Sequence, residues 1–461
     1  EMRLAGEFGV NLAFEGGTPV TLTSVETAMR GDGAFIDADG NEWANLADLI
    51  AENPGLADID PLGIGIRLRA PDALLTVAGD GLASNGAAID IESEFYRQDA
   101  PVDSGGGDIT INATTNGLIA SILEAETRSG GGDITLTGTI VQLRGDVRSE
   151  GGAITATAGP RFSGLTTLLV DGNIGSAGGD IHLETIDGGD FVQEAGTRID
   201  AGATGTVRIA GSEDVTITDV RSGALDLDNP AVHVSAEGTL TGLGTGPFIL
   251  APSAFGIARI EAGEIANTGP EGFRMDASVI DARVRGGAMH LANGRDAIVA
   301  RLVNAGGGTV DLVNRGDLRL AGLVTGGDVV LTALGGIEGF AGQPIPVTAG
   351  RAFVTALDGS IGAPGDPLPL GTDGIGRLVA IATGAVVIDS PDARLDAEGV
   401  AAASGPVALR SAGTVRVGRL VAPDPVSIVG PGGVTVVQRF DNGTVSTLPV
   451  GVADIVAPGI Y

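Results

Sequence analysis

Residues Gly130-Gly131-Gly132-Asp133-Ile134-Thr135-Leu136 decide the fold, because this unit of glycines followed by an alternating aliphatic strand returns along the chain. Further copies occupy residues 105–111, 151–156, 178–183, 286–291, 306–312, 326–331 and 432–436. Consecutive copies are about 19 to 28 residues apart, which is the repeat length of a solenoid coil. The sequence therefore indicates a stack of similar coils.

The unit explains how one coil is built. The glycine pair turns the chain at positive φ without a Cβ clash. The aspartate that often follows can hydrogen-bond the backbone of the turn. The Ile-x-Leu segment then directs two aliphatic side chains to one side and a small polar residue to the other. One coil cannot bury its own inner face, so coils must stack with each aliphatic residue above its counterpart.

These features predict an all-β chain, a parallel β-helix or β-solenoid. Crossovers between parallel strands are almost always right-handed, so we expect a right-handed helix. The composition agrees, with 43% hydrophobic residues, only 3% aromatic residues and 77 glycines. An aliphatic interior with few rings fits a thin, stacked core. The chain has no cysteine, which excludes disulfides, thiol chemistry and Cys-ligated metals.

The charge of the chain restricts its partners. The 27 basic residues are all arginine, and with 58 acidic residues they give a net charge of −31. Such a surface repels nucleic acid and anionic lipid and attracts divalent cations. No segment approaches the roughly 18 apolar residues of a membrane span. We therefore expect no nucleic-acid partner and no membrane insertion.

The N-terminal part of the chain differs from the rest. Residues 34–43 read as a hairpin around Asp39-Gly40, and residues 45–55 as a short helix that ends at Pro54-Gly55. We assign residues 1–69 to N-terminal strands with this hairpin and helix, an excursion from or a cap on the solenoid. Residues 70–461 form the solenoid, with irregular Pro/Gly-rich coils near residues 340–371.

The repeats resemble those of filamentous haemagglutinin-like bacterial exoproteins and adhesins over roughly residues 70–440. The resemblance lies in the Gly-Gly-Asp-Ile-x-Leu units, in a preceding Leu-x-Gly-x-Val strand, and in residues 172–176 (Gly-Asn-Ile-Gly-Ser) and 359–364 (Gly-Ser-Ile-Gly-Ala-Pro). It implies a right-handed parallel β-helix, secretion across the outer membrane, and a role in adhesion, biofilm or surface coating.

Calcium is the metal that the sequence favours most. Asp37, Asp39, Asn41 and Asp48 fall at positions one, three, five and twelve of a calcium-loop pattern. The sixth position, however, is Glu42 where glycine is required, and the twelfth is aspartate rather than glutamate. A hairpin turn followed by a helix explains the same residues. Apart from this calcium ion, we expect no cofactor.

Other chemical signals have structural explanations. His182, His233 and His290 are far apart in strand contexts, and we expect His182 and His290 to point outward between two aliphatic residues. Residues 144–146 and 315–317 spell Arg-Gly-Asp, a tripeptide that some integrins bind, but both lie beside predicted strands rather than at loop tips. No nucleophile elbow, phosphate loop or dinucleotide fingerprint is present.

Together with the resemblance to bacterial adhesins, the sequence predicts an extracellular structural or adhesive solenoid rod, part of a fibre, sheath or adhesin on a bacterial cell surface, and not an enzyme. Its expected partners are further copies of the chain, joined end to end or side by side with cations between them, and host or surface glycans. The alternative is a polysaccharide lyase or a tailspike-like glycan hydrolase on the same scaffold. A lateral groove with clustered carboxylates and aromatic rings would favour the enzyme.

Overall fold

The chain folds as a parallel β-solenoid of about 15 turns, as predicted, with no helix in the part of the chain that is described. The computed structural model describes residues 65–84, 86–113, 121–159, 167–225, 229–266, 271–340, 347–371, 377–392, 394–423 and 426–441, together with the strands β1 (Met2–Gly6), β2 (Val10–Ala13), β3 (Val20–Thr27), β4 (Phe35–Ile36), β5 (Glu42–Trp43), β44 (Thr444–Ser446) and β45 (Val452–Val456). The chain forms two compact units. Unit 1 comprises Glu1–Gly238 and Leu243–Thr245, and unit 2 comprises Thr239–Gly242 and Gly246–Tyr461.

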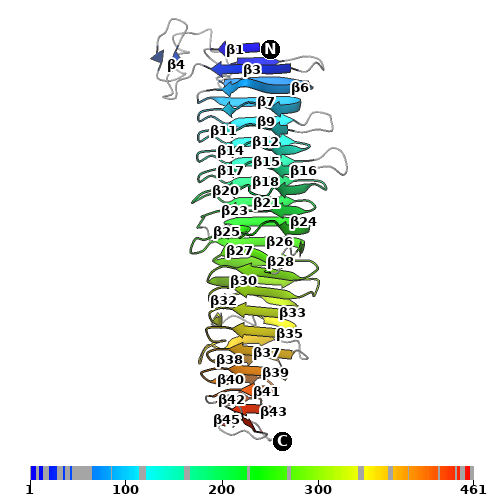
Figure 1. Ribbon diagram of the computed structural model, residues 1–461, viewed down its shortest axis with the longest axis vertical. Helices are drawn as coiled ribbons and strands as arrows, with labels where there is room; N and C mark the ends of the chain where they lie inside the picture. The colour runs from blue at the N-terminus through cyan, green and yellow to red at the C-terminus, as the bar shows by residue number, and fades with distance from the viewer. Residues whose placement is uncertain are drawn as a thin grey trace. The chain divides into compact units, whose positions relative to one another are not determined.

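Each regular turn of unit 1 has three strands, and equivalent strands of successive turns pair in parallel to form three ladders. The first ladder follows the glycine corners and contains β7 (Ala88–Gln98), β9 (Ile109–Ala113), β12 (Ile134–Gly138), β15 (Ile154–Ala158), β18 (Ile181–Thr185), β21 (Val207–Gly211) and the start of β24 (Val232–Gly242). The second contains β10 (Ser121–Leu123), β13 (Val141–Leu143), β16 (Thr167–Val170), β19 (Asp190–Gln193) and β22 (Val215–Ile217). The third contains β8 (Val102–Asp103), β11 (Thr127–Arg128), β14 (Val147–Arg148), β17 (Ile174–Gly175), β20 (Ile199–Asp200) and β23 (Val220–Arg221). A longer strand, β6 (Gly65–Ala83), precedes them and pairs with β7 and β8. Figure 1 shows the successive strands of the first ladder one above the next.

The core of unit 1 consists of columns of aliphatic side chains. In the first ladder Ile109, Ile134, Ile154 and Ile181 pair in register, and none is more than 1% exposed. The residue between two inward positions, such as Thr135, points outward, as the burial pattern of β12 shows. The alternation predicted from Ile-x-Leu is therefore confirmed.

The corner glycines serve two different physical needs. Gly130 and Gly131 have φ of 62° and 132°, a backbone conformation that L-residues with side chains seldom adopt. Gly132 does not have positive φ, but a Cβ there would lie 2.4 Å from the carbonyl carbon of Gly107 in the preceding turn. The third glycine is therefore required by the close approach of stacked backbones.

The aspartates of the Gly-Gly-Asp units join one turn to the next, which differs from the expected bond within the turn. Asp108 Oδ1 accepts a hydrogen bond of 2.9 Å from the amide of Asp133, whose own Oδ1 accepts one of 2.7 Å from the amide of Ala153. Asp180 and Thr206 repeat the arrangement at 2.7 Å. These carboxylates extend the backbone ladder through the corner, where the main chain is no longer extended.

Unit 2 has the same parallel stacking with longer strands, several of which run through a corner. Its described strands are β25 (Ile249–Ala251), β26 (Ile257–Ala266), β27 (Phe273–Ala277), β28 (Val279–Val284), β29 (Met289–Asn293), β30 (Ala297–Asn304), β31 (Val310–Asn314), β32 (Leu318–Leu320), β33 (Val324–Ala333), β34 (Ile337–Gly339), β35 (Val347–Ala356), β36 (Leu368–Gly371), β37 (Arg377–Ala382), β38 (Val386–Ser390), β39 (Arg394–Ala402), β40 (Val407–Ser411), β41 (Thr414–Val421), β42 (Val426–Val429), β43 (Gly433–Asp441), β44 (Thr444–Ser446), which pairs antiparallel with β43, and β45 (Val452–Val456). One face consists of β29, β31, β33, β35, β37, β39 and β41, paired in sequence.

The structure describes only part of the N-terminal region for which a hairpin and a short helix are predicted. The predicted hairpin is confirmed, because β4 and β5 pair antiparallel with Phe35 opposite Trp43. The predicted helix at residues 45–55 lies outside the described residues. The division at residue 70, which falls within β6, stays a prediction. No helix in the described part of the chain is long and apolar enough to cross a membrane.

Truncating a column residue tests the stacked core. We expect Leu136→Ala to lower the free energy of unfolding by about 2–5 kcal/mol, because Leu136 is fully buried between Ile111 and Ala156. The control Thr135→Ala, one residue away on the outward side, should change it by no more than about 0.5 kcal/mol. Equilibrium urea unfolding measures both, and equal effects would contradict the inward and outward assignment.

Candidate functional site

The outer side of the third ladder in unit 1 carries the best candidate site. Each strand of this ladder is short, with one buried residue followed by one outward residue. The outward positions of successive turns form a row, occupied by Asp103, Arg128, Arg148, Gly175, Asp200 and Arg221. Gly175 is the one position in this row without a side chain.

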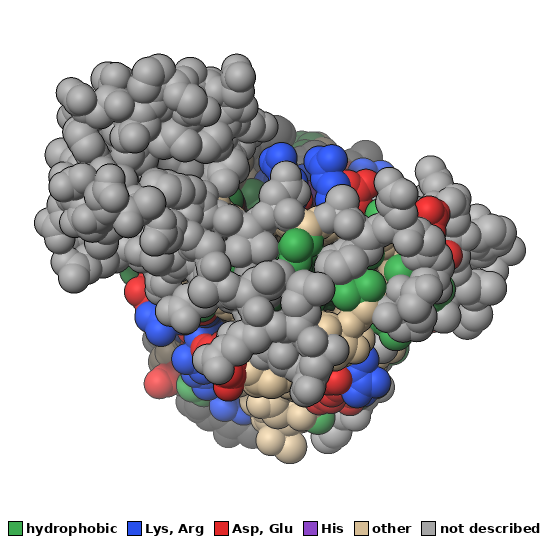
Figure 2. Space-filling view, turned by 90° about the horizontal axis from the view of Figure 1, so that it is seen from above, with side chains coloured by type: hydrophobic (Ala, Val, Ile, Leu, Met, Phe, Trp, Pro, Cys, Tyr) green, Lys and Arg blue, Asp and Glu red, His purple; other side chains and the backbone are tan. Residues whose placement is uncertain are grey.

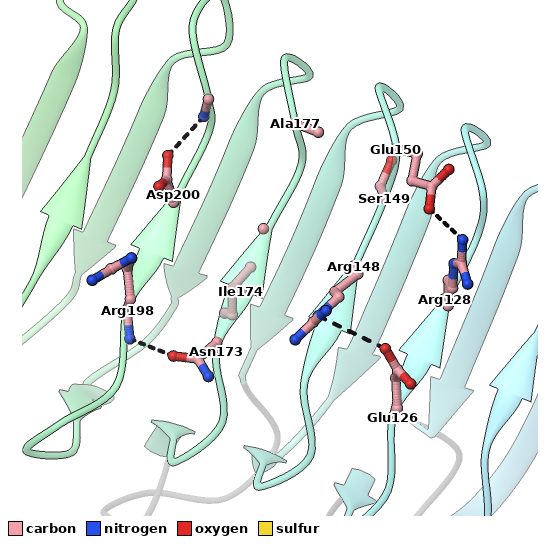
Figure 3. A pocket seen from close by; sticks show the side chains of 12 residues that line it. Glu126, Arg128, Arg148, Ser149, Glu150, Asn173, Ile174, Ala177, Arg198 and Asp200 are labelled. Carbon is pink, nitrogen blue, oxygen red and sulfur yellow. Dashed lines mark hydrogen bonds and ion pairs between the residues drawn. The ribbon is translucent and has the colours of Figure 1, made fainter.

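A groove of about 800 Å³ lies along this row. Its residues are Glu126, Arg128, Arg148, Ser149, Glu150, Asn173, Ile174, Gly175, Ala177, Arg198, Asp200 and Gly202. In Figure 3, Arg148 lies on one side of the Ile174 strand and Arg198 and Asp200 lie on the other. A Cβ at Gly175 would have only one atom nearby, the carbonyl oxygen of Asp200 at 3.9 Å, so the missing side chain leaves open space.

Guanidinium groups and carboxylates lie next to one another along the groove. Arg128 pairs with Glu150, and Arg148 lies 2.5 Å from Asp146 and 3.7 Å from Glu126. Figure 2, a view from above, shows arginine side chains next to acidic ones on the part of the described surface that is visible there. The groove is thus polar and balanced in charge, although the chain as a whole is strongly acidic.

Asn173 fixes the floor of the groove. Its backbone and side-chain amides donate hydrogen bonds of 2.9 Å and 3.1 Å to Asp146 Oδ1 in the preceding turn. Its own Oδ1 accepts one of 3.1 Å from the amide of Arg198 in the following turn. This is the inter-turn bonding of the Gly-Gly-Asp corners, repeated on a different face. It holds the outward residues of three turns in fixed positions.

The rim of the groove contains a strained residue. Ala177 has φ of 52°, in the left-handed region where the corresponding corner residues Gly130 and Gly202 are glycines. A residue with a Cβ in this conformation costs about 1–3 kcal/mol and is enriched at functional sites. The strain at Ala177 therefore supports this groove as a site.

A column of buried serines beside the groove was missed by the sequence interpretation. Ser104, Ser129, Ser149 and Ser176 precede the glycine corners and are at most 1% exposed. Each hydroxyl donates to the carbonyl oxygen three residues later, as Ser149 does to Gly152 at 2.7 Å. The recurring Ser-x-Gly-Gly pattern is the signal that predicts this corner. These serines are structural, since their hydroxyls are bonded inside the coil.

The histidines lie where they were expected. His182 and His290 occupy outward positions of β18 and β29, and each is half exposed. Burial and, more weakly, Arg208 lower the pKa of His182, while Glu184 opposes them. His290 lies 3.1 Å from Asp311. The two histidines are in different units, so they do not form a common site.

Both Arg-Gly-Asp tripeptides, residues 144–146 and 315–317, use their aspartate to join turns. Asp146 accepts the bonds from Asn173 described above, and Asp317 Oδ1 accepts one of 2.8 Å from the amide of Gly336. An integrin would have to displace these bonds, which favours the structural interpretation. A third copy in the sequence, residues 30–32, lies outside the described residues.

The predicted calcium ligands are not described. Asp37, Asp39, Asn41 and Asp48 all lie outside the described residues, so calcium binding there stays a prediction. Elsewhere, across the described ranges, no group of three or more His, Asp or Glu side chains is placed to hold a metal ion.

The pH dependence of stability tests the role of Asp146. Burial tends to raise the pKa of this carboxyl, but hydrogen bonds from Asn173 and Arg148 outweigh it and lower the pKa. Its stabilisation is therefore present above the unfolded pKa, near 3.9, and is lost as pH falls through the folded pKa. We expect Asp146→Asn to cost about 1–2 kcal/mol at pH 7 and less at pH 3.

Urea unfolding at pH 7, 4 and 3 measures this difference. The exposed Asp171 on the neighbouring turn supplies the control Asp171→Asn, for which we expect only a small change in stability. A difference between wild type and Asp146→Asn that stays constant down to pH 3 would show that the carboxylate charge has no stabilising role.

Comparison with known proteins identifies no relative of this chain. No protein-family model matches the chain, and neither a curated protein nor a solved structure is significantly similar to it. The arguments for function therefore rest on the repeat sequence, the solenoid fold and the geometry of the groove.

Proposed function

We propose that the chain is a structural and adhesive solenoid of a bacterial cell surface, similar to filamentous haemagglutinin-like exoproteins, and that the groove at Gly175 binds a saccharide unit of a host or surface glycan. The observation that carries the proposal is the groove itself. It interrupts a row of charged side chains at one turn and leaves hydrogen-bonding groups on both sides.

The chemistry of the groove suits a ligand rich in hydroxyl groups. Arginine offers several donors in a fixed plane, carboxylates accept, and the Asn173 amide contributes both kinds of group. The volume of about 800 Å³ is within the range of ligand sites. The strands of Arg148 and Asp200 are two turns apart, roughly 10 Å, which leaves room for one sugar ring between their side chains.

A binding role is favoured over glycan hydrolysis or elimination, so we propose that the chain is not an enzyme. Glu126 and Glu150 are 46% and 56% exposed, and each lies beside an arginine. A glycosidase keeps its acid protonated by enclosing it in an apolar pocket. The described lining also has no aromatic ring to stack on a sugar.

The proposal includes a secreted, extracellular location and self-association. A net charge of −31 opposes the approach of two copies unless cations bridge them or uncharged surfaces meet. Surface labelling of intact producing cells with an antibody against the chain tests the location, and staining only after the cells are opened would contradict it.

Filling the groove tests glycan binding. Gly175→Gln adds a polar side chain where the neighbouring turns already carry Arg148 and Asp200, so the fold should tolerate it. We expect the wild-type chain to bind at least one saccharide on a glycan array and the variant to bind it at least tenfold more weakly.

The matched control is Gly286→Gln in unit 2. A Cβ at Gly286 also meets a single atom, the carbonyl oxygen of Gly263 at 3.9 Å, so the two substitutions are equally easy to accommodate. We expect its binding to equal that of the wild type. No bound glycan, or equal binding by Gly175→Gln, would overturn the groove as a site, and release of reducing ends or unsaturated products would favour the enzyme instead.

A further inference from the structure

One outward face of unit 2 carries no charged side chain over four successive turns. It lies on β33, β35, β37 and β39, which pair in parallel, with one register shift between Leu378 and Val379, and are labelled in Figure 1. We call it the uncharged face, and it consists of Val330, Thr332, Leu334, Phe353, Thr355, Leu357, Val379, Ile381, Thr383, Gly399, Ala401 and Ala403. The residues between them, such as Leu331 and Val354, point into the core and are fully buried.

The uncharged face is open to solvent and largely apolar. Leu334, Leu357 and Ile381 are 51%, 55% and 47% exposed. Val313, in the preceding turn and in the same row as Thr332, is 43% exposed and extends the apolar surface. Large apolar side chains that gather on one face with a polar rim are typical of an interaction surface.

Charged residues surround this face but do not enter it. Along one edge Arg351 pairs with Asp328 at 2.5 Å, and Arg377 pairs with Glu398 at 2.7 Å. At the two ends of the row, Asp311 precedes Val330 and Arg419 follows Gly399. The four residues of the edge pairs balance in charge, while Asp396 lies opposite Arg377 at the same edge and the exposed Asp358 follows Leu357 at the other.

The corresponding face of unit 1 is different. The outward positions of its first ladder are charged at both ends, with Asp90 and Glu92 at one end and His182, Glu184 and Arg208 at the other. The turns between them are uncharged but polar, with Thr110, Asn112, Thr135, Thr137, Thr155 and Thr157 in place of large apolar side chains. The parallel solenoid therefore does not by itself require an uncharged exterior. Its presence on β33 to β39 is a property of this sequence.

We propose that the uncharged face packs against the same face of a second copy of the chain. Two copies with a charge of −31 each repel through their acidic surfaces, and a face without carboxylates lets them approach. Because both copies have the same spacing between turns, about 4.8 Å, their side chains can interdigitate turn by turn as two sheets about 10 Å apart. A contact between identical faces closes at two copies.

The size of the face sets the strength of the contact. Four turns of about 4.8 Å and five residues of about 3.3 Å give roughly 300 Å² per copy. The total for two copies is below the roughly 1,200–2,000 Å² of stable complexes. The pair is therefore weak and forms at high local concentration, as on a crowded surface. The uncharged face is thus the surface through which the self-association proposed above takes place. Pairing through it does not require the groove to bind a glycan.

Sedimentation of the full chain over a range of concentrations tests the pairing. We expect a reversible dimer that persists in EDTA, because no cation is needed, and that strengthens at high salt, because salt screens the mutual repulsion. Ile381→Asp places a charge in the middle of the face and should weaken dimerisation at least tenfold. Thr155→Asp, on the outward side of the first ladder of unit 1, is the matched control and should leave it unchanged.

A cross-link gives a readout that does not depend on a destabilising substitution. Since the chain has no cysteine, Thr355→Cys introduces a single thiol in the middle of the face. We expect oxidation to produce disulfide-linked dimers of Thr355→Cys but not of Thr155→Cys. A chain that stays monomeric at all concentrations, a dimer abolished by EDTA, or equal cross-linking of the two variants would overturn the proposal, whatever the outcome of the glycan array.

Discussion

The hydrogen bonds between equivalent residues of successive turns are the interaction on which the rest of the structure depends. They hold neighbouring backbones about 4.8 Å apart, and this distance dictates what each position accepts. Gly132 must lack a Cβ because the carbonyl group of Gly107 lies directly against it. Ile109, Ile134 and Ile154 form one buried column because each packs on the next. The same spacing places the side chains of the groove and of the uncharged face in regular rows.

Much of the fold could be predicted from the sequence, because the repeat expresses this spacing directly. The glycine unit at residues 130–136 and its copies predicted the corner, the strand and the inward direction of the aliphatic residues. The carboxylates of Asp108 and Asp133 were placed correctly in the corner, but their partners were not, since they accept hydrogen bonds from the next turn. A single repeat does not reveal which turn supplies the partner of a polar side chain.

The groove could not be predicted from the motif, because it depends on a difference between turns. Gly175 follows a buried residue, Ile174, as Arg128 follows Thr127 and Arg148 follows Val147. Only the register of β11, β14 and β17 shows that Gly175 leaves a gap in their row. The uncharged face has the same origin, because its equivalent positions are 20 to 26 residues apart in the sequence and none of them is unusual by itself. In a solenoid, a surface site is formed by residues at equivalent positions of successive turns. These residues are far apart in the sequence, so the site is not visible in any one segment.

The inter-turn carboxylates also give the coil a direction. Asp108, Asp133 and Asp180 each belong to one turn and receive the amide of the turn that follows it in the chain. A turn that has already folded therefore offers acceptors in fixed positions to the residues that come next. During synthesis the N-terminal turns are made first, so each new turn finds the acceptors of the preceding turn already in place. Each folded turn can therefore guide the next into register, and the stack can be extended from its N-terminal side.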